Sequence, residues 1–137
     1  MSLTTNTAVL PQTPLSCTAV LKEAETTFQS PTNVVTLLDE TDNVNGARLT
    51  RVVAIPRANI GTANNIQLYE YTGTTYTLID SALMATVSPS ASVANAKTDF
   101  GYTEDSPKLV RAGYGIKAAM GQAVANGVVV VAEGALY

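Results

Sequence analysis

The sequence predicts an all-β fold: an antiparallel β-sandwich or jelly-roll-like barrel of about seven or eight short strands with an extended N-terminal arm. The apolar residues are mostly Ala and Val and are joined by many Thr, and β-branched side chains favour strands. Turn signals recur at fairly regular spacing, and little of the pattern is helical. The length of 137 residues fits one domain, which we place at residues 15–137 after an arm at residues 1–14.

The predicted arm is polar, rich in Thr, and closed by Pro11 and Pro14. Because proline lacks a backbone donor, this segment is interpreted as extended chain rather than as part of a packed core. A disordered terminus and an arm that becomes ordered against a neighbouring subunit both remain open.

Strand-like runs begin after the arm. Residues 15–21 form a first apolar run, and residues 34–38 and 48–55 lie on either side of the polar stretch 39–46. That stretch ends in Asn45-Gly46, a pair that suits a tight turn with positive φ. We therefore expect the two flanking runs to form a hairpin with a long tip.

The clearest unit is a second hairpin in the middle of the chain. Apolar and polar side chains alternate over residues 66–71, Thr72-Gly73-Thr74 supplies the turn, and residues 76–80 form the returning strand. Residues 81–87 are expected to make one or two helical turns, with Ser81 as the N-cap. Residues 88–105 are small and polar and predict a long surface loop.

The last third returns to strands, at residues 109–110, 115–120 and 128–132. Asn126-Gly127 is a further tight-turn pair. The four consecutive valines at 128–131 do not fit one face of an amphipathic helix. They favour a strand that is buried on both sides or lies at a subunit contact.

Composition excludes several functions. A net charge of −3 with a pI near 4.7 and eight scattered basic residues gives no footprint for nucleic acid. No apolar run is long enough to span a membrane, and the N-terminus does not match a signal peptide. With one cysteine and no histidine, neither an internal disulfide nor a cysteine-built zinc site is expected. We predict no catalytic residues, no metal, no cofactor and no enzymatic activity.

Gly113-Tyr114-Gly115-Ile116-Lys117-Ala118 matches a dinucleotide-binding string, with Glu133 placed 20 residues after Gly113. That interpretation needs a helix over about residues 116–125, which Gly121 disfavours. Nothing upstream alternates strand and helix, and only four residues follow Glu133. The preferred interpretation is a strand whose glycines allow another backbone to approach closely.

Two groups of acids allow other chemistry. The stretch 39–46 is acidic, but aligned on Gly46 it puts Thr41 and Val52 where a calcium loop needs Asp and Glu. An irregular calcium site remains open beside a solvated hairpin tip. Asp99, Glu104 and Asp105 could suggest glycoside hydrolysis, but ordinary loop acids are preferred.

Cys17 lies in an apolar strand and is interpreted as a small buried hydrophobe. Tyrosine is favoured at interfaces because it buries area while keeping a polar group. We expect the arm and the tyrosines to contribute the contacts with partners. The predicted interface residues are Leu3, Val9, Leu10, Pro11, Tyr69, Tyr71, Tyr76 and Tyr137.

The Thr/Ala/Val-rich acidic chain resembles the small virion structural proteins of tailed bacteriophages, and most of all their capsid decoration (cement) proteins. The resemblance covers roughly residues 30–137 and is carried by the order of several blocks. These are residues 54–58, 62–69 and 73–79 in the middle, and residues 109–113, 126–131 and 135–137 in the tail.

This resemblance implies a β-rich protein on the outside of the expanded capsid, made in the cytoplasm of the host bacterium. It would span joints between subunits of the major capsid protein and stabilise the head against packaged DNA. The implied partners are the major capsid protein and neighbouring copies of the same chain, as a dimer or trimer. The arm would reach a neighbour, and no nucleic acid or membrane would be bound.

Other functions remain open beside that one. The chain could be a neck, tail or fibre-attachment subunit of the particle, which differs in copy number and partner. It could also be a cell-surface or carbohydrate-binding β-sandwich module. An enzyme that binds a dinucleotide is the remaining alternative.

Overall fold

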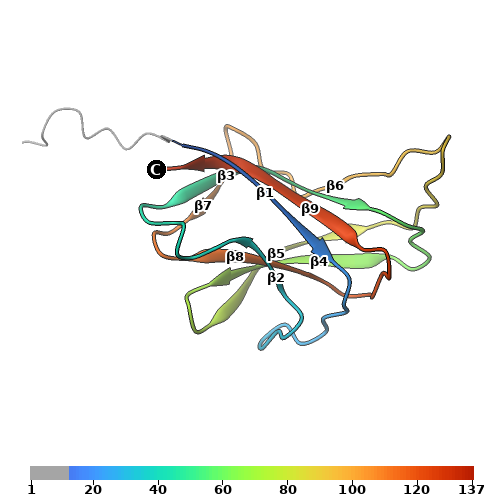
Figure 1. Cartoon of the computed structure of the whole chain (residues 1–137), viewed down its shortest axis with the longest axis horizontal. Helices are drawn as coiled ribbons and strands as arrows, with labels where there is room; N and C mark the ends of the chain where they lie inside the picture. The colour runs from blue at the N-terminus through green and yellow to red at the C-terminus, as the bar shows by residue number, and fades with distance from the viewer. Residues whose placement is uncertain (1–12) are drawn as a thin grey trace, which may run out of the picture.

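A computed structural model describes residues 13–137 as two antiparallel sheets packed face to face (Figure 1). No helix occurs in this part of the chain, so the predicted all-β sandwich is confirmed. The nine strands are β1 (Thr13–Leu21), β2 (Val35–Leu38), β3 (Ala47–Pro56), β4 (Asn64–Tyr71), β5 (Tyr76–Met84), β6 (Thr98–Asp99), β7 (Lys108–Val110), β8 (Gly115–Met120) and β9 (Val128–Leu136).

The first sheet has the order β1-β9-β3-β6, and β7 also pairs with β3. The first strand of the chain therefore pairs along its whole length with the last, from Thr13 opposite Leu136 to Leu21 opposite Val128. The second sheet has the order β2-β8-β4-β5. β1 begins at Thr13, so the predicted arm overlaps it by two residues. Leu3, Val9, Leu10 and Pro11 lie outside the described residues.

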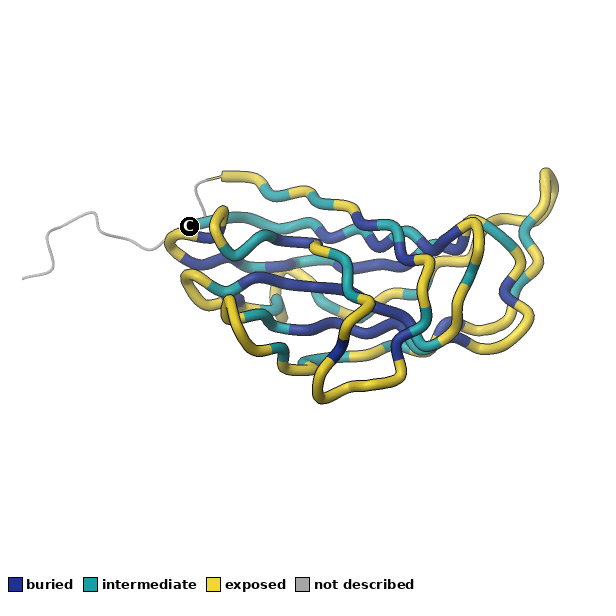
Figure 2. Tube along the Cα trace, turned by 60° about the horizontal axis from the view of Figure 1, so that its bottom comes forward, coloured by how far each residue is buried: buried dark blue, intermediate teal, exposed yellow. Residues whose placement is uncertain are grey.

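The core lies between the sheets and is built from alternate residues of their strands. In β9, Val128 and Val130 are fully buried, whereas Val129 and Val131 are half-buried on the outer face. The valine run is therefore a strand, as expected, but it is not buried on both sides, because its outer face is partly open. Figure 2 shows the same alternation of buried and more exposed residues along several strands.

The hairpin expected between residues 34–38 and 48–55 is wrong. β2 pairs with β8 in the second sheet, whereas β3 pairs with β9, β7 and β6 in the first. The polar stretch 39–46 crosses from one sheet to the other. Because this stretch is long, it does not force β2 and β3 to pair with each other, and each can pair with a strand that is distant in sequence. Each strand also has residues that are buried in the core between the two sheets.

The helical turns expected at residues 81–87 are also wrong, because β5 continues as far as Met84. Ser81 pairs with Gln67 and Met84 with Asn64 in the β4–β5 ladder. Met84 is fully buried while Leu83 is largely exposed, which is the period of two expected for a strand. Pairing with β4 thus overrides the local preference for helix.

The structure confirms the second expected hairpin and the glycine turns. The β4–β5 hairpin is confirmed, with Gly73 at a φ of 102° in its turn. Gly46 and Gly127 also have positive φ, as their Asn-Gly pairs predict. The stretch 88–105 is mostly irregular and contains the short strand β6.

Candidate functional site

Four half-buried tyrosines gather at one end of the sandwich. Tyr71 ends β4, Tyr76 begins β5, Tyr114 precedes β8 and Tyr137 follows β9. The antiparallel registers bring these points to one end, where residues 39–46 and 111–114 link the two sheets. We call this group the tyrosine end. Thr13 lies there too, opposite Leu136, so β1 begins at the same end.

The centre of the tyrosine end is a stack of two rings. Tyr71 and Tyr76 face each other across the β4–β5 hairpin, with ring centroids 4.4 Å apart and planes inclined by 28°. The Tyr71 hydroxyl donates to the Gly73 carbonyl at 2.8 Å, and the Thr72 amide donates to the Thr75 carbonyl at 3.0 Å. These bonds hold the turn and fix the positions of both rings.

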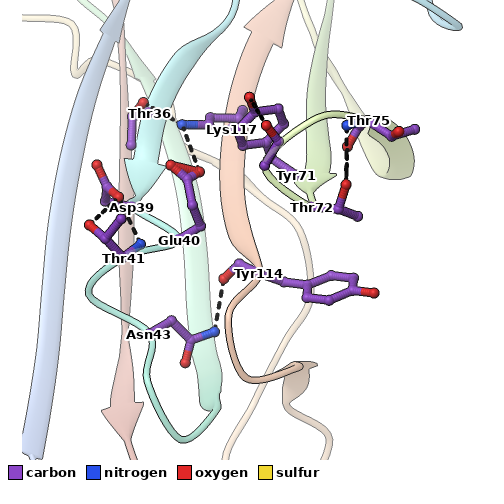
Figure 3. A network of polar contacts seen from close by, with 11 residues as sticks. Thr36, Asp39, Glu40, Thr41, Asn43, Tyr71, Thr72, Thr75, Tyr114 and Lys117 are labelled. Carbon is purple, nitrogen blue, oxygen red and sulfur yellow. Dashed lines mark hydrogen bonds and ion pairs between the residues drawn. The ribbon is translucent and has the colours of Figure 1, made fainter.

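Lys117 points toward Tyr71, with its ammonium 4.9 Å from the centre of the Tyr71 ring (Figure 3). The ammonium donates to the Thr36 hydroxyl at 2.8 Å and lies 3.8 Å from a carboxylate oxygen of Glu40. Lys117 is only 7% exposed, so the cation is held by its ring, hydroxyl and carboxylate neighbours rather than by bulk water. Burial raises the pKa of the Tyr76 hydroxyl, and the neighbouring Tyr71 and Glu40 raise it further.

A second cation lies on Tyr114. The Arg111 guanidinium is 4.8 Å from the centre of the Tyr114 ring and 3.2 Å from the Glu70 carboxylate. The fully buried Asn43 holds this loop, because its side-chain amide donates to the carbonyls of Arg111 at 2.7 Å and Tyr114 at 2.8 Å. Asn43 therefore ties the crossing stretch 39–46 to the loop that precedes β8.

The dinucleotide-like string forms part of this loop and of β8. Residues 115–120 are a buried strand, so the helix that would face a pyrophosphate is not formed. A Cβ atom on Gly115 would lie 2.8 Å from the Leu38 carbonyl oxygen. The preferred interpretation, a strand with glycine at a close backbone approach, is confirmed.

Two acids of residues 39–46, Asp39 and Glu40, have different partners. The Asp39 carboxylate accepts hydrogen bonds from the Thr41 amide at 2.9 Å and the Thr41 hydroxyl at 2.7 Å, which lower the pKa of Asp39. Glu40 turns toward Lys117 instead. In residues 13–137 no three His, Cys, Asp or Glu side chains lie together as a metal site would need.

Two acids of the long loop also contact other residues of the chain. Asp99 accepts from the Gly101 amide at 2.8 Å, and Glu104 lies 3.8 Å from Arg48. Cys17 is half-buried against the core, and burial raises the pKa of its thiol.

Tyr69 is the exception among the predicted interface tyrosines. It is 0% exposed, and its hydroxyl donates to Gln67 at 2.6 Å. Gln67 in turn donates to the Glu25 carbonyl, in the segment between β1 and β2. Tyr69 therefore offers no surface to a partner, whereas Tyr71, Tyr76 and Tyr137 stay partly exposed.

Sequence reasoning considered Tyr114 and Lys117 only as part of the dinucleotide-like string, and it did not connect them or Arg111 with the other tyrosines. Each lies on β8 or the loop before it, and only the pairing of β8 with β2 and β4 brings them beside Tyr71. The run of small residues around them predicts a strand and carries no signal for contact with the tyrosines of other strands.

Two of the open hollows beside the strands lie at opposite ends of the sandwich. One, of about 320 Å³, adjoins the tyrosine end and is lined by Tyr76, Thr74 and Thr75 together with residues 29–32. The other, of about 380 Å³, lies at the opposite end between residues 58–64 and 122–126. Both are lined mainly by uncharged side chains.

Comparison of the chain with protein-family models, with curated proteins and with solved structures gave no match. Within residues 13–137 there is no helix long and apolar enough to cross a membrane.

Proposed function

We propose that this chain is a non-enzymatic structural protein of a tailed-phage particle, which binds the outside of the capsid lattice and stabilises the head. The proposal joins the block resemblance of residues 30–137 to one observation, the tyrosine end. There, three of the predicted interface tyrosines lie on the same end of a two-sheet scaffold as the start of β1.

The chemistry of the tyrosine end suits contact with another protein. Tyrosine is enriched at interfaces because its ring buries a large area with few rotatable bonds and its hydroxyl can bond at the rim. Here the rings are held by stacking and by cations with carboxylate partners, so little side-chain freedom is lost on binding.

The scaffold also suits a load-bearing role. Sheets with partner strands on both sides resist local opening because many backbone bonds must break together. β9 lies between β1 and β3, and β8 lies between β2 and β4, so each sheet has a fully paired centre. A protein that bridges capsid subunits needs such a rigid body between its contacts.

The first test is quantitative mass spectrometry of purified particles from the source phage. We expect a copy number near that of the major capsid protein. A few copies per particle would instead indicate a neck, tail or fibre-attachment subunit. Absence from the particle would end the virion proposal and favour a cell-surface or carbohydrate-binding module.

The second test measures binding of the purified chain to expanded capsid shells. Tyr76→Ala should weaken binding by roughly tenfold or more, as expected for a buried tyrosine anchor. Leu83→Ala is the matched control, because Leu83 lies at the other end of the same strand and is 69% exposed. Equal binding by both variants would show that the tyrosine end does not contact the shell.

A further inference from the structure

The edge strands of the two sheets differ in how they are protected against pairing with a strand of another molecule. Among the described residues, β6 and β7 are edges of two and three residues, and β2 is an edge of four. β5 is long, but a bulge interrupts its pairing near Leu78, and the Asp80 carboxylate is bonded to the Tyr102 hydroxyl. Short length, bulges and inward-pointing charges are known devices against unwanted strand pairing.

β1 has almost none of these devices. All nine of its residues pair with β9 without a register shift, and the strand carries no charged residue. Only Pro14, at the second position, removes a backbone donor. No strand of the described residues pairs with the other side of β1, and Figure 2 shows the strand along one margin of the molecule. An edge of this kind is a template for another strand.

We propose that two copies of the chain associate by antiparallel pairing of their β1 strands about a two-fold axis at Cys17. Cys17 is the middle residue of the nine, so this register uses the whole strand, with Thr13 of one copy opposite Leu21 of the other. The first sheets of both copies would then form one continuous sheet, joined by on the order of six to eight backbone hydrogen bonds.

The side chains of β1 are self-complementary in this register. On the core side, half-buried Leu15 lies opposite Ala19 of the second copy, and Cys17 lies opposite Cys17. On the outer side, exposed Ser16 lies opposite Thr18, so hydroxyl meets hydroxyl. A two-fold contact places a strand against itself, and the absence of charge in β1 means that no like charges oppose each other.

This pairing rests on the self-association part of the proposed function and supplies its surface. It does not depend on binding to the capsid. The two can therefore fail separately, and the experiment below measures the pairing on the purified full-length chain.

Cys17 provides a direct test of the register. Directly opposed residues of an antiparallel pair have Cα atoms about 4.5–5.5 Å apart, which a disulfide can span. Under mild oxidation by copper-phenanthroline with dissolved oxygen, we expect the wild-type chain to form a disulfide-linked dimer. The matched control moves the thiol by one residue, as Ser16→Cys in a Cys17→Ser background. In the proposed register its two Cα atoms are roughly 8 Å apart, too far for a disulfide.

The control should cross-link at least about tenfold more slowly than wild type. Residue 16 is more exposed than Cys17, so random collision would favour the control instead. Equal or faster cross-linking of the control would therefore overturn the pairing, as would a chain that is monomeric at every concentration in sedimentation.

A pair of lysine variants tests the edge itself. Thr18→Lys places a charge on the outer face of β1, next to the β1 strand of the second copy. This change should weaken dimerisation by roughly tenfold or more. Thr77→Lys makes the same change at an exposed threonine of β5 and should leave dimerisation unchanged. Circular dichroism checks that both fold. Equal dimerisation of the two variants, or loss only in Thr77→Lys, would overturn the β1 assignment.

Discussion

At the scale of single residues, Glu25 organises the segment between β1 and β2. It is 3% exposed, and its carboxylate accepts hydrogen bonds from the amides of Thr32 at 2.6 Å, Asn33 at 2.7 Å and Thr27 at 2.9 Å. Its own backbone amide donates to Met120 in β8. Desolvation opposes the charge, but the amide donors outweigh it and the pKa of Glu25 is lowered. One carboxylate thus fixes the segment that covers Tyr69.

Glu25→Gln should lower the free energy of unfolding at neutral pH by about 1–2 kcal/mol, because an amide oxygen is a weaker acceptor than a carboxylate. A lowered pKa means that the stabilisation is complete above the ordinary value of 4.5 and is lost as the pH falls through the folded-state pKa. Urea unfolding of both proteins should therefore show a difference at neutral pH that shrinks in acid. The exposed neighbour gives the control, Glu23→Gln, which should change little at either pH. A Glu25→Gln difference that stays constant with pH would contradict the role assigned to the charge.

At the scale of elements, β9 is placed by two neighbours at once, and its glycine shows how closely they approach. A Cβ atom on Gly134 would clash with the Arg48 carbonyl oxygen in β3 and would lie 2.9 Å from the Leu49 Cα atom. These contacts are with backbone, next to the register shift between Leu49 and Arg51, so no side chain can move aside. β3 and β9 can approach this closely only because residue 134 has no side chain.

Gly134→Ala should destabilise the protein by about 3 kcal/mol or more, or prevent folding, because the central strand must shift away from β3. Gly73→Ala should cost only about 1 kcal/mol, since its strain is conformational and nothing lies within 4 Å of the added Cβ atom. Thermal unfolding of the two variants measures the contrast. Similar losses for both would show that the β3–β9 contact is looser than the structure indicates.

The elements also show where sequence patterns succeed. The β4–β5 hairpin was predictable because its partners are adjacent in sequence and a glycine turn joins them. The expected hairpin of β2 with β3 failed because eight residues separate them and the better partners, β8 and β9, lie far along the chain. The expected helix at residues 81–87 failed because a ladder with β4 was available to the same residues.

At the scale of the whole molecule, the pairing of β1 with β9 joins the two ends of the described chain. The first sheet cannot be completed until residues 13–21 and 128–136 meet, because β9 supplies the partner of both β1 and β3. Bringing such distant segments together costs loop-closure entropy, and the strand pairing that offsets this cost forms only afterwards. The topology therefore bears on the rate of folding as well as on the site.

Refolding from denaturant should accordingly be slow for a domain of this size, with a main phase in the range of about milliseconds to seconds. Stopped-flow fluorescence of the tyrosines measures this rate. Because the tyrosine end is assembled from strands of both halves of the chain, the change in tyrosine signal should coincide with formation of β structure in circular dichroism. A main phase in microseconds, or a tyrosine signal that is complete before the sheet forms, would contradict this expectation.

The sequence by itself determined the class of this fold and its turns: a chain rich in Val and Thr, with Asn-Gly pairs and a glycine hairpin, has few ways to bury its apolar residues other than as strands. It also predicted Tyr71, Tyr76 and Tyr137 as interface residues, which stays a prediction. Only the tertiary structure decided which strands pair, that Tyr69 is buried, and that Lys117, Arg111 and Tyr114 join the tyrosine end. The physical reason is that local preferences depend on neighbours in sequence, whereas strand partners and burial depend on segments a hundred residues away that complete the same sheet.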